Sequence, residues 1–234
     1  MSTPATRRAF WQGLRDGAPF LLVVGPFALL FGVAATAAGL DIVETMAMTA
    51  LVVAGASQFT ALTLMQEQAP TLIVIFTALA VNMRMALYSA SLAPYLGQAR
   101  LGTRALAAYF LVDGAYTLSA AKYEREEMTL SARLAYFFAA VLPMALCWYA
   151  LTWVGAVTGQ AIPESWPLDF ALPITFIAIV APMLRRLPHL VAAFVSINVT
   201  LALSWMPYSL GLIVAAFLAM AAGAMVEAWQ ERQG

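Results

Sequence analysis

The stretch LAVNMRMALYSASLAPYL, residues 79–96, decides how the rest of the chain is interpreted. It belongs to an apolar run over residues 71–93, and about 20 mostly apolar residues are enough for a helix to cross ~30 Å of hydrocarbon. Arg84 lies near the middle of that run. An arginine at such a depth costs about 2.5–3.5 kcal/mol on insertion scales, so it is expected to face protein or water and to be paired. The stretch therefore predicts a membrane helix with a polar centre.

The composition places the whole chain among integral membrane proteins. Of its 234 residues, 63% are apolar and only 10% are charged, and the mean hydropathy is +0.83. Soluble domains are closer to half apolar and a quarter charged. The formal net charge is zero, which provides no basic surface for nucleic acid, and the single cysteine, Cys147, excludes an intrachain disulfide. Because every connection between apolar runs is short, we expect residues 1–234 to form a single integral membrane domain.

The apolar runs predict an all-α polytopic membrane fold with about eight transmembrane helices. Seven helices is the alternative, because only WMPYS separates the last two runs. The runs cover residues 19–40, 45–65, 71–93, 105–121, 132–157, 168–184, 188–206 and 207–227.

Basic residues in the short connections predict the orientation, since cytoplasmic loops are enriched in lysine and arginine. With eight helices and a cytoplasmic N-terminus, Arg100 and Arg104 fall on the outer side. Every other basic residue outside the runs then falls on the cytoplasmic side. We therefore expect both the N-terminus and the C-terminus in the cytoplasm.

A short internal similarity suggests two halves of the chain. PTLIVIFTALAVN (70–82) and PHLVAAFVSIN (188–198) both run from a proline to an asparagine. Their positions would relate the third run to the seventh and make a 4+4 repeat in parallel orientation. Chance similarity between two apolar segments explains the match equally well.

The second run contains GASQF, residues 55–59. Gly55 and Ser57 allow close approach of the backbone, and Gln58 needs a polar partner inside a membrane. Helices of transporters that are interrupted at glycine expose backbone groups toward a cavity, so a broken helix is predicted here. The alternative is plain packing of small residues, with Gln58 bonded to a neighbouring helix.

Small residues also mark the first run. Gly25, Gly32 and Gly39 recur every seven residues, with Ala28 and Ala35 between them. This spacing makes a smooth stripe along one face of a helix. Here we expect close packing against another helix rather than a binding site.

Arg84 has a natural partner in the fourth run. Asp113 lies inside YFLVDGAY (109–116), and charged residues within membrane helices tend to pair with one another. Tyr109 and Thr117 are each four residues from Asp113 and would form one polar stripe with it on a continuous helix. A purely structural pair is the alternative to a functional one, although buried pairs seldom add net stability.

Four stretches carry a resemblance to a known family. They are GASQF (55–59), NMRMALYSASLAPYL (82–96), YFLVDGAY (109–116) and LDFALPITFIAIVAP (168–182). Together, and in this order, they resemble the AzlC-type family of bacterial branched-chain amino acid exporters. The resemblance implies the large subunit of a two-component secondary transporter of the bacterial inner membrane, working with a small membrane subunit of the AzlD type. It implies export of leucine, isoleucine, valine and sometimes methionine, driven by the proton gradient and without a cofactor.

A zwitterionic substrate with a branched side chain needs donors for its carboxylate, acceptors for its ammonium group and an apolar wall. Asp113 would pair with Arg84 or couple transport to a proton, and neither a catalytic residue nor a metal ligand is predicted. The expected partners are the AzlD-type subunit, the amino acid substrate and the lipid bilayer, with a homo-oligomer left open. A permease for another small solute and a non-transporting membrane subunit are the alternative functions. The predicted substrate-binding residues are Gly55, Ser57, Gln58, Phe59, Asn82, Arg84, Tyr88 and Asn198.

Overall fold

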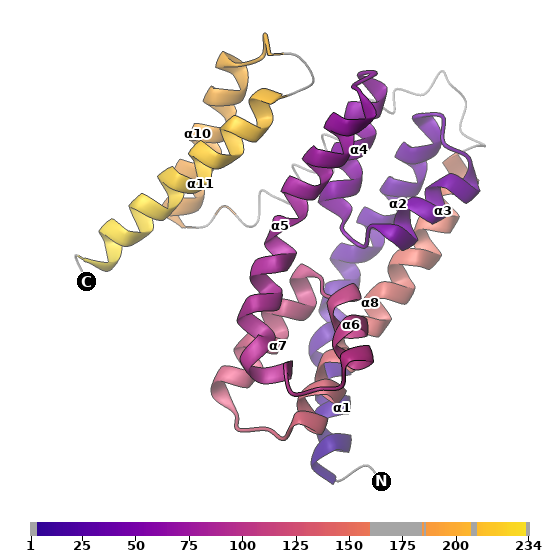
Figure 1. Cartoon of the computed structure of the whole chain (residues 1–234), viewed down its shortest axis with the longest axis vertical. Helices are drawn as coiled ribbons and strands as arrows, with labels where there is room; N and C mark the ends of the chain where they lie inside the picture. The colour runs from indigo at the N-terminus through magenta and orange to yellow at the C-terminus, as the bar shows by residue number, and fades with distance from the viewer. Residues whose placement is uncertain (1–3, 160–183, 185, 207–209, 233–234) are drawn as a thin grey trace. The chain divides into compact units, whose positions relative to one another are not determined.

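The computed structural model describes residues 4–159, 184, 186–206 and 210–232, and the regular structure of these residues is helical throughout (Figure 1). The chain divides into two compact units, the first formed by residues 1–62 and 78–163, the second by 63–77 and 164–234. The predicted run 168–184 lies almost wholly outside the described residues. The helices are α1 (Pro4–Gly17), the short 3-10 helix η1 (Ala18–Phe20), α2 (Leu21–Ala37), α3 (Ile42–Leu51), α4 (Gly55–Gln66), α5 (Thr71–Leu96), α6 (Leu101–Tyr109), α7 (Asp113–Arg125), α8 (Leu130–Gly159), α10 (Leu187–Ala202) and α11 (Leu210–Glu231).

Long apolar helices bear out the prediction of a helical membrane protein. Within the described part of the chain, four helical stretches are long and apolar enough to cross a membrane; each overlaps one of the predicted runs, and the first begins 15 residues earlier than predicted. They are Pro4–Ala37, Thr71–Leu96, Leu130–Gly159 and Leu210–Gln230.

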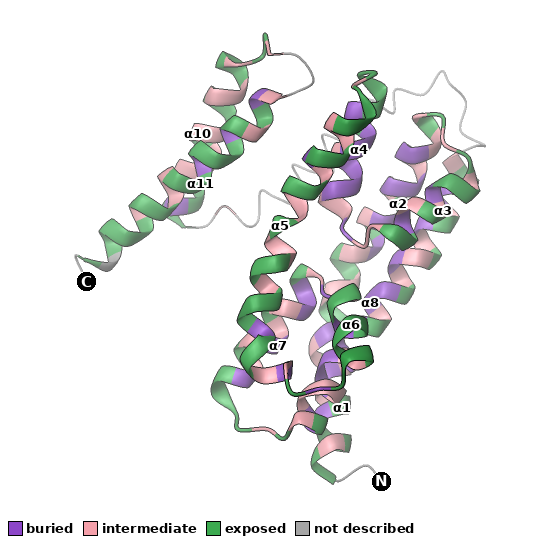
Figure 2. Cartoon of the chain, viewed as in Figure 1, coloured by how far each residue is buried: buried purple, intermediate pink, exposed green. Residues whose placement is uncertain are grey.

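The first unit is organised around α8, which packs along α1 and α2. Gly13 faces Tyr136 and Gly17 faces Ala140, and the two partners are 123 residues apart in both cases. Helices α1 and α2 therefore run parallel to α8, with each residue level with the one 123 positions later. We call the end at which α1 and α8 begin the proximal end, and the end at which α2 and α8 finish the distal end. In Figure 2 buried residues follow α2 and α8.

Glycines bring the α2 and α8 backbones into contact. A Cβ on Gly32 would overlap the carbonyl oxygen of Thr152, and Ala28 and Ala35 are fully buried. The predicted packing role of the small-residue stripe is therefore confirmed for these positions. Gly39 is different, because it lies just beyond α2 with a φ of +92° and faces open space. That positive φ suits glycine at the end of a helix.

Helix α7 runs from the middle of the first unit to its proximal end. Near its start, a Cβ on Gly114 would lie 3.3 Å from Sδ of Met144 in α8. Near its finish, the hydroxyl of Tyr123 donates a hydrogen bond to the carbonyl of Arg133 (2.7 Å). Eleven residues of α8, or about 16 Å, separate Met144 from Arg133. Helix α7 is thus antiparallel to α8 and begins about half-way through a hydrocarbon layer of ~30 Å.

Helix α6 also begins at the proximal end. Helix α5 finishes there, because the Tyr95 carbonyl accepts a hydrogen bond from Nη1 of Arg133 (3.3 Å). Only four residues join α5 to α6, and Nη1 of Arg104 bonds back to the Gly97 carbonyl (3.3 Å). Helix α6 therefore runs inward from the proximal end, and α7 returns to it after an interruption at Phe110–Val112. The two helices form a re-entrant hairpin, α6/α7.

Helices α3 and α4 form a second re-entrant hairpin, α3/α4, from the opposite side. Helix α2 finishes at the distal end, and α3 begins after a four-residue connection. Beyond an interruption at Val52–Ala54, α4 lies against α5, where the Ser57 hydroxyl donates to the carbonyl of Ala78 (2.7 Å). Gly55 faces Phe27 of α2, and Phe59, one turn later, packs on Phe31, one turn nearer the distal end (ring centroids 5.6 Å apart), so α4 returns toward the distal end. Both hairpins can be followed in Figure 1.

Two predictions are wrong because of these hairpins. The runs 45–65 and 105–121 are not single spans, since each enters and leaves on one side of the first unit. Arg100 and Arg104 consequently lie at the proximal end together with the N-terminal arginines, and not on the opposite side. Hydropathy could not reveal this, because the residues at both interruptions are mostly apolar.

In the second unit, α10 packs antiparallel to α11. A Cβ on Gly211 would lie 2.8 Å from the Leu203 carbonyl oxygen, and one on Gly223 would lie 3.3 Å from Cβ of Ala192. The last two predicted runs are thus separate helices, although the 16 residues of α10 rise only about 24 Å. The 4+4 repeat remains a prediction.

Candidate transport site where the two hairpins meet

The tips of the two hairpins are in direct contact. Tyr109, the last residue of α6, donates its hydroxyl hydrogen bond to the carbonyl of Ala50 near the end of α3 (2.7 Å). The hydroxyl of Tyr149 in α8 lies 2.9 Å from that of Tyr109, and Tyr149 is the donor because the Tyr109 hydrogen is already used. Non-helical backbone at membrane depth is tolerated only where protein covers it or water fills a cavity beside it. The contact makes the two interruptions parts of one site.

Each tip presents the N-terminus of a half-helix. The first intrahelical bonds of α4 and α7 are donated by the amides of Gln58 and Tyr116. The amides that precede them in each helix have no intrahelical partner. Helix N-termini carry a partial positive charge and attract anions. Two such termini near the middle of a membrane give the site a means of holding a carboxylate.

The ion pair lies at the tip of α6/α7. Nη1 of Arg84 in α5 is 3.1 Å from Oδ2 of Asp113. Asp113 is the first residue of α7, where a carboxylate is favoured by the helix dipole. One turn after Arg84, Tyr88 stacks on Tyr116 with ring centroids 4.1 Å apart and lies beside Asp113. The Arg84 and Asp113 side chains are 34% and 52% exposed, so a ligand can reach both partners.

Two polar atoms of α5 near this pair are buried and have no hydrogen-bond partner among the described residues. They are Nε of Arg84, which is a donor, and Oδ1 of Asn82, which is an acceptor. Residues two apart lie on different sides of a helix, so Asn82 and Arg84 mark opposite edges of the half-buried face of α5. Arg84 has donor capacity left after its bond to Asp113.

Aromatic packing fixes the tip of α3/α4. A Cβ on Gly55, the first residue of α4, would lie 2.5 Å from the Phe27 ring and 2.8 Å from the Trp148 ring. Phe59 is buried and packs on Phe27 with ring centroids 4.9 Å apart. Gly55 and Phe59 were predicted to bind substrate, and the structure places both of them in the wall between α2, α4 and α8.

The polar side chains of GASQF are also engaged within the protein. Besides the Ser57 bond to α5, Nε2 of the fully buried Gln58 donates to Oγ1 of Thr49 in α3 (2.9 Å). This bond joins the two halves of the hairpin across its interruption. At this tip the groups left for a ligand are the backbone amides at the start of α4 and Oε1 of Gln58, which is buried and has no partner among the described residues.

Asn198 lies in the second unit, on α10. Its Nδ2 donates to the carbonyl of Phe194 one turn earlier (2.7 Å). Its role in substrate binding remains a prediction.

Sequence reasoning missed Tyr149 and misread the surroundings of Asp113. The predicted polar stripe is confirmed for Thr117, which lies four residues after Asp113 in α7 and donates to its carbonyl (2.8 Å), and is wrong for Tyr109, which ends α6. The signal that could have found the interruption is the sequence Val-Asp-Gly. Aspartate is favoured in the first turn of a helix. Gly114 then allows close packing, since a Cβ there would lie 2.8 Å from the Phe20 ring.

Tyrosines and an arginine close the proximal side of the site. Tyr123 is only 4% exposed, and the guanidinium of Arg133 lies over its ring, 5.8 Å from the centroid. Burial raises the pKa of the Tyr123 hydroxyl to about 12, so this group stays protonated and keeps its bond to the Arg133 carbonyl. Because Arg133 also bonds to the Tyr95 carbonyl of α5, helices α5, α7 and α8 are joined on the proximal side of the ion pair.

Comparisons with known proteins agree with this architecture. Residues 19–162, which contain both hairpins, match the AzlC protein family. The inner membrane protein YgaZ of Escherichia coli (strain K12) is 26% identical over 183 residues, covering 76% of this chain and 74% of that protein. An uncharacterized membrane protein of Archaeoglobus fulgidus is 29% identical over 225 residues, covering 94% of each chain. No solved structure matches the chain.

Proposed function

Because this chain belongs to the AzlC family, we propose that it is a secondary transporter that exports branched-chain amino acids across the bacterial inner membrane. The carrying observation is that two half-membrane hairpins, inserted from opposite sides, meet beside the Arg84–Asp113 ion pair. Transporters bind small solutes near the membrane midplane at discontinuous helices, whose half-helix ends face the substrate. A scaffold subunit has no need of such interruptions.

The groups at the site match the two charges of an amino acid. The carboxylate would be held by the free donor of Arg84 and the N-terminal amides of the half-helices. The ammonium group would be held by Asp113 and by helix-end carbonyls. The stacked rings of Tyr88 and Tyr116 offer an apolar surface for the branched side chain. Leucine, isoleucine, valine and methionine share these requirements.

Proton coupling would act through the ion pair. Deprotonated Asp113 would hold the ammonium group of the substrate while Arg84 turns toward its carboxylate. Protonation of Asp113 from the outer side would remove the charge that holds the ammonium group and so expel the substrate, and loss of the proton to the cytoplasm would restore the Arg84–Asp113 pair. One carboxylate is enough for this cycle, and Gly114, where a second acidic residue would have to displace the Phe20 ring, offers none.

The charges at the two ends support a cytoplasmic N-terminus. Acidic residues lie at the distal end of the first unit, at Asp41 and Glu44. Basic residues concentrate at the proximal end, and positively charged connections stay in the cytoplasm. In this orientation α3/α4 opens to the outside and α6/α7 to the cytoplasm, and the two hairpins would serve as outer and inner gates. The C-terminus is placed in the cytoplasm on the sequence alone.

An export assay tests the proposal. Vesicles containing the chain, with or without an AzlD-type small subunit, are loaded with labelled isoleucine and given a proton gradient. We expect gradient-driven efflux that is lost in Arg84→Gln and Asp113→Asn and retained in the charge-matched controls Arg125→Gln and Glu127→Gln, which change exposed residues. Efflux that survives both site variants would refute the site and leave the exporter. No efflux of any branched-chain amino acid from a folded complex would favour a permease for another solute.

A further inference from the structure

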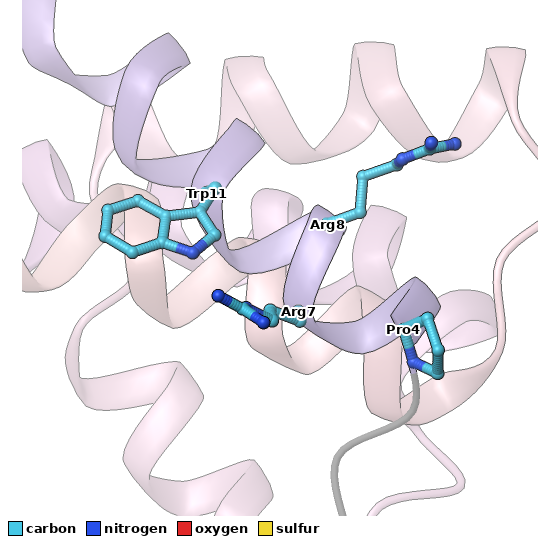
Figure 3. Close-up of a pocket in the computed structure, with 4 residues that line it drawn as sticks. All are labelled: Pro4, Arg7, Arg8 and Trp11. Carbon is cyan, nitrogen blue, oxygen red and sulfur yellow. The ribbon is translucent and has the colours of Figure 1, made fainter.

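We propose that the outer face of α1 carries a binding site for the headgroup of an anionic phospholipid, formed by Arg7, Arg8 and Trp11. A shallow pocket of about 440 Å³ lies on this face, and these three residues line it with Pro4. Figure 3 shows Arg7 and Arg8 extending to different sides of α1, with Arg7 on the side of the Trp11 indole. The site lies apart from the transport centre.

The packing of α1 fixes which face is presented to the bilayer. Ala9, Gly13 and Gly17 are buried, and the two glycines lie directly against the α8 backbone. Helix α1 therefore cannot turn its arginines inward. The opposite face is open, with Trp11 57% exposed. A guanidinium and an exposed indole on one fixed face suit the boundary between hydrocarbon and headgroups.

The alignment with α8 gives the depth of this face. Trp11 is level with Leu134, the residue that follows Arg133 and opens the apolar part of α8. The edge of the hydrocarbon is therefore near Trp11. Arg7 lies about 6 Å farther out, one helical turn, within a headgroup layer that is about 5–8 Å thick on each side of a bilayer.

Charge complementarity identifies the occupant. Among the described residues, no acidic side chain pairs with Arg7 or Arg8. The same proximal end carries Arg100 and Arg104. A guanidinium binds phosphate oxygens through charge-assisted hydrogen bonds, and the membrane surface supplies phosphate at this depth. A lipid phosphate with net negative charge is the ligand that fits.

Native mass spectrometry of the full chain, titrated separately with phosphatidylglycerol and with phosphatidylcholine, tests this site. Each arginine near an anionic surface contributes about 5-fold in affinity, so Arg7→Gln with Arg8→Gln should weaken phosphatidylglycerol binding about 25-fold. The matched control is Arg100→Gln with Arg104→Gln, which removes the same charge from the same end and should weaken binding less than about 3-fold. The melting temperature without added lipid should not change in the first pair, because both arginines are exposed.

Three results would overturn the proposal. Equal losses in the two double variants would mean diffuse attraction by net charge rather than a site. Equal binding of the two lipids by the unaltered chain would mean that the headgroup charge is not recognised. Full displacement of phosphatidylglycerol by millimolar inorganic phosphate would mean a site for free phosphate rather than for lipid.

Discussion

Removing the two members of the ion pair singly and together measures whether they act on each other. At the observed 3.1 Å, two unit charges attract by about 1 kcal/mol in bulk water and about 5 kcal/mol at an effective dielectric constant of ~20. The Asp113 side chain is 52% exposed and that of Arg84 is 34% exposed, so the value must be discounted toward that of exposed pairs. We expect an interaction free energy of about 1 kcal/mol.

The single changes should not be equivalent. Asp113→Asn leaves a charged Arg84 inside an apolar helix, where an arginine without a partner is costly. A loss of about 1 kcal/mol corresponds to a fall in melting temperature of about 2–4 °C for a chain of this size. Adding Arg84→Gln to Asp113→Asn removes the stranded charge. The double variant should therefore recover most of the protein level and melting temperature, while isoleucine export stays lost.

Melting temperatures of the four proteins in mild detergent, with export measured on the same preparations, provide the cycle. Independent residues give costs that add to within about 0.3–0.5 kcal/mol. If the double variant melts lowest, and its loss equals the sum of the single losses, the pairing at Arg84 and Asp113 contributes nothing. The mechanism proposed for proton coupling would then have to be abandoned.

Three further changes probe the frame and the tips. Gly32→Ala drives a Cβ into the α8 backbone and should cost about 1–3 kcal/mol of stability, seen as a lower melting temperature. Gly102→Ala, where no atom lies within 4 Å of the new Cβ, should cause no loss, and equal stability of the two variants would contradict the packing. Tyr109→Phe removes both hydrogen bonds that join the hairpin tips to each other and to α8, and Tyr149→Phe removes one of them, so export should fall about 10-fold in the first variant and less in the second. A larger loss in Tyr149→Phe would refute the role given to the Tyr109 hydroxyl. Gly55→Ala pushes into two aromatic rings and should raise the KM for isoleucine with little change in protein level; an unchanged KM would separate this tip from the substrate.

The sequence predicted what depends on the chemistry of single residues. Arg84 inside an apolar run demands an opposite charge, and Asp113 is the aspartate that lies inside such a run, so their pairing follows without knowledge of the fold. The packing stripe of Gly25 and Gly32 follows in the same way from spacing along one helix. These inferences needed no information about which helix lies beside which.

A break at GASQF was predicted from the sequence, but the turning back of the chain at both interruptions depends on long-range contacts that no local pattern contains. Val52–Ala54 and Phe110–Val112 are as apolar as a continuous span would be, so hydropathy cannot separate a crossing from a turn-back. Whether the chain crosses or turns back depends on contacts such as the hydrogen bond from the Tyr109 hydroxyl to the carbonyl of Ala50, 59 residues earlier in the chain. The misplacement of Arg100 and Arg104 followed directly from counting a turn-back as a crossing.

The alignment of α2 with α8 also orders the steps by which the protein is made. Their partners are 123 residues apart, and a ribosome adding about 5–20 residues per second needs roughly 6–25 s to synthesise that interval. Throughout that time the glycine face of α2 has no helix to receive it, and the tip of α3/α4 lacks the Trp148 ring against which Gly55 rests. The tip of α3/α4 can therefore reach its final packing only after Trp148 of α8 has been synthesised. Until then, α3 and α4 lack the surface of α8 against which Gly55 packs.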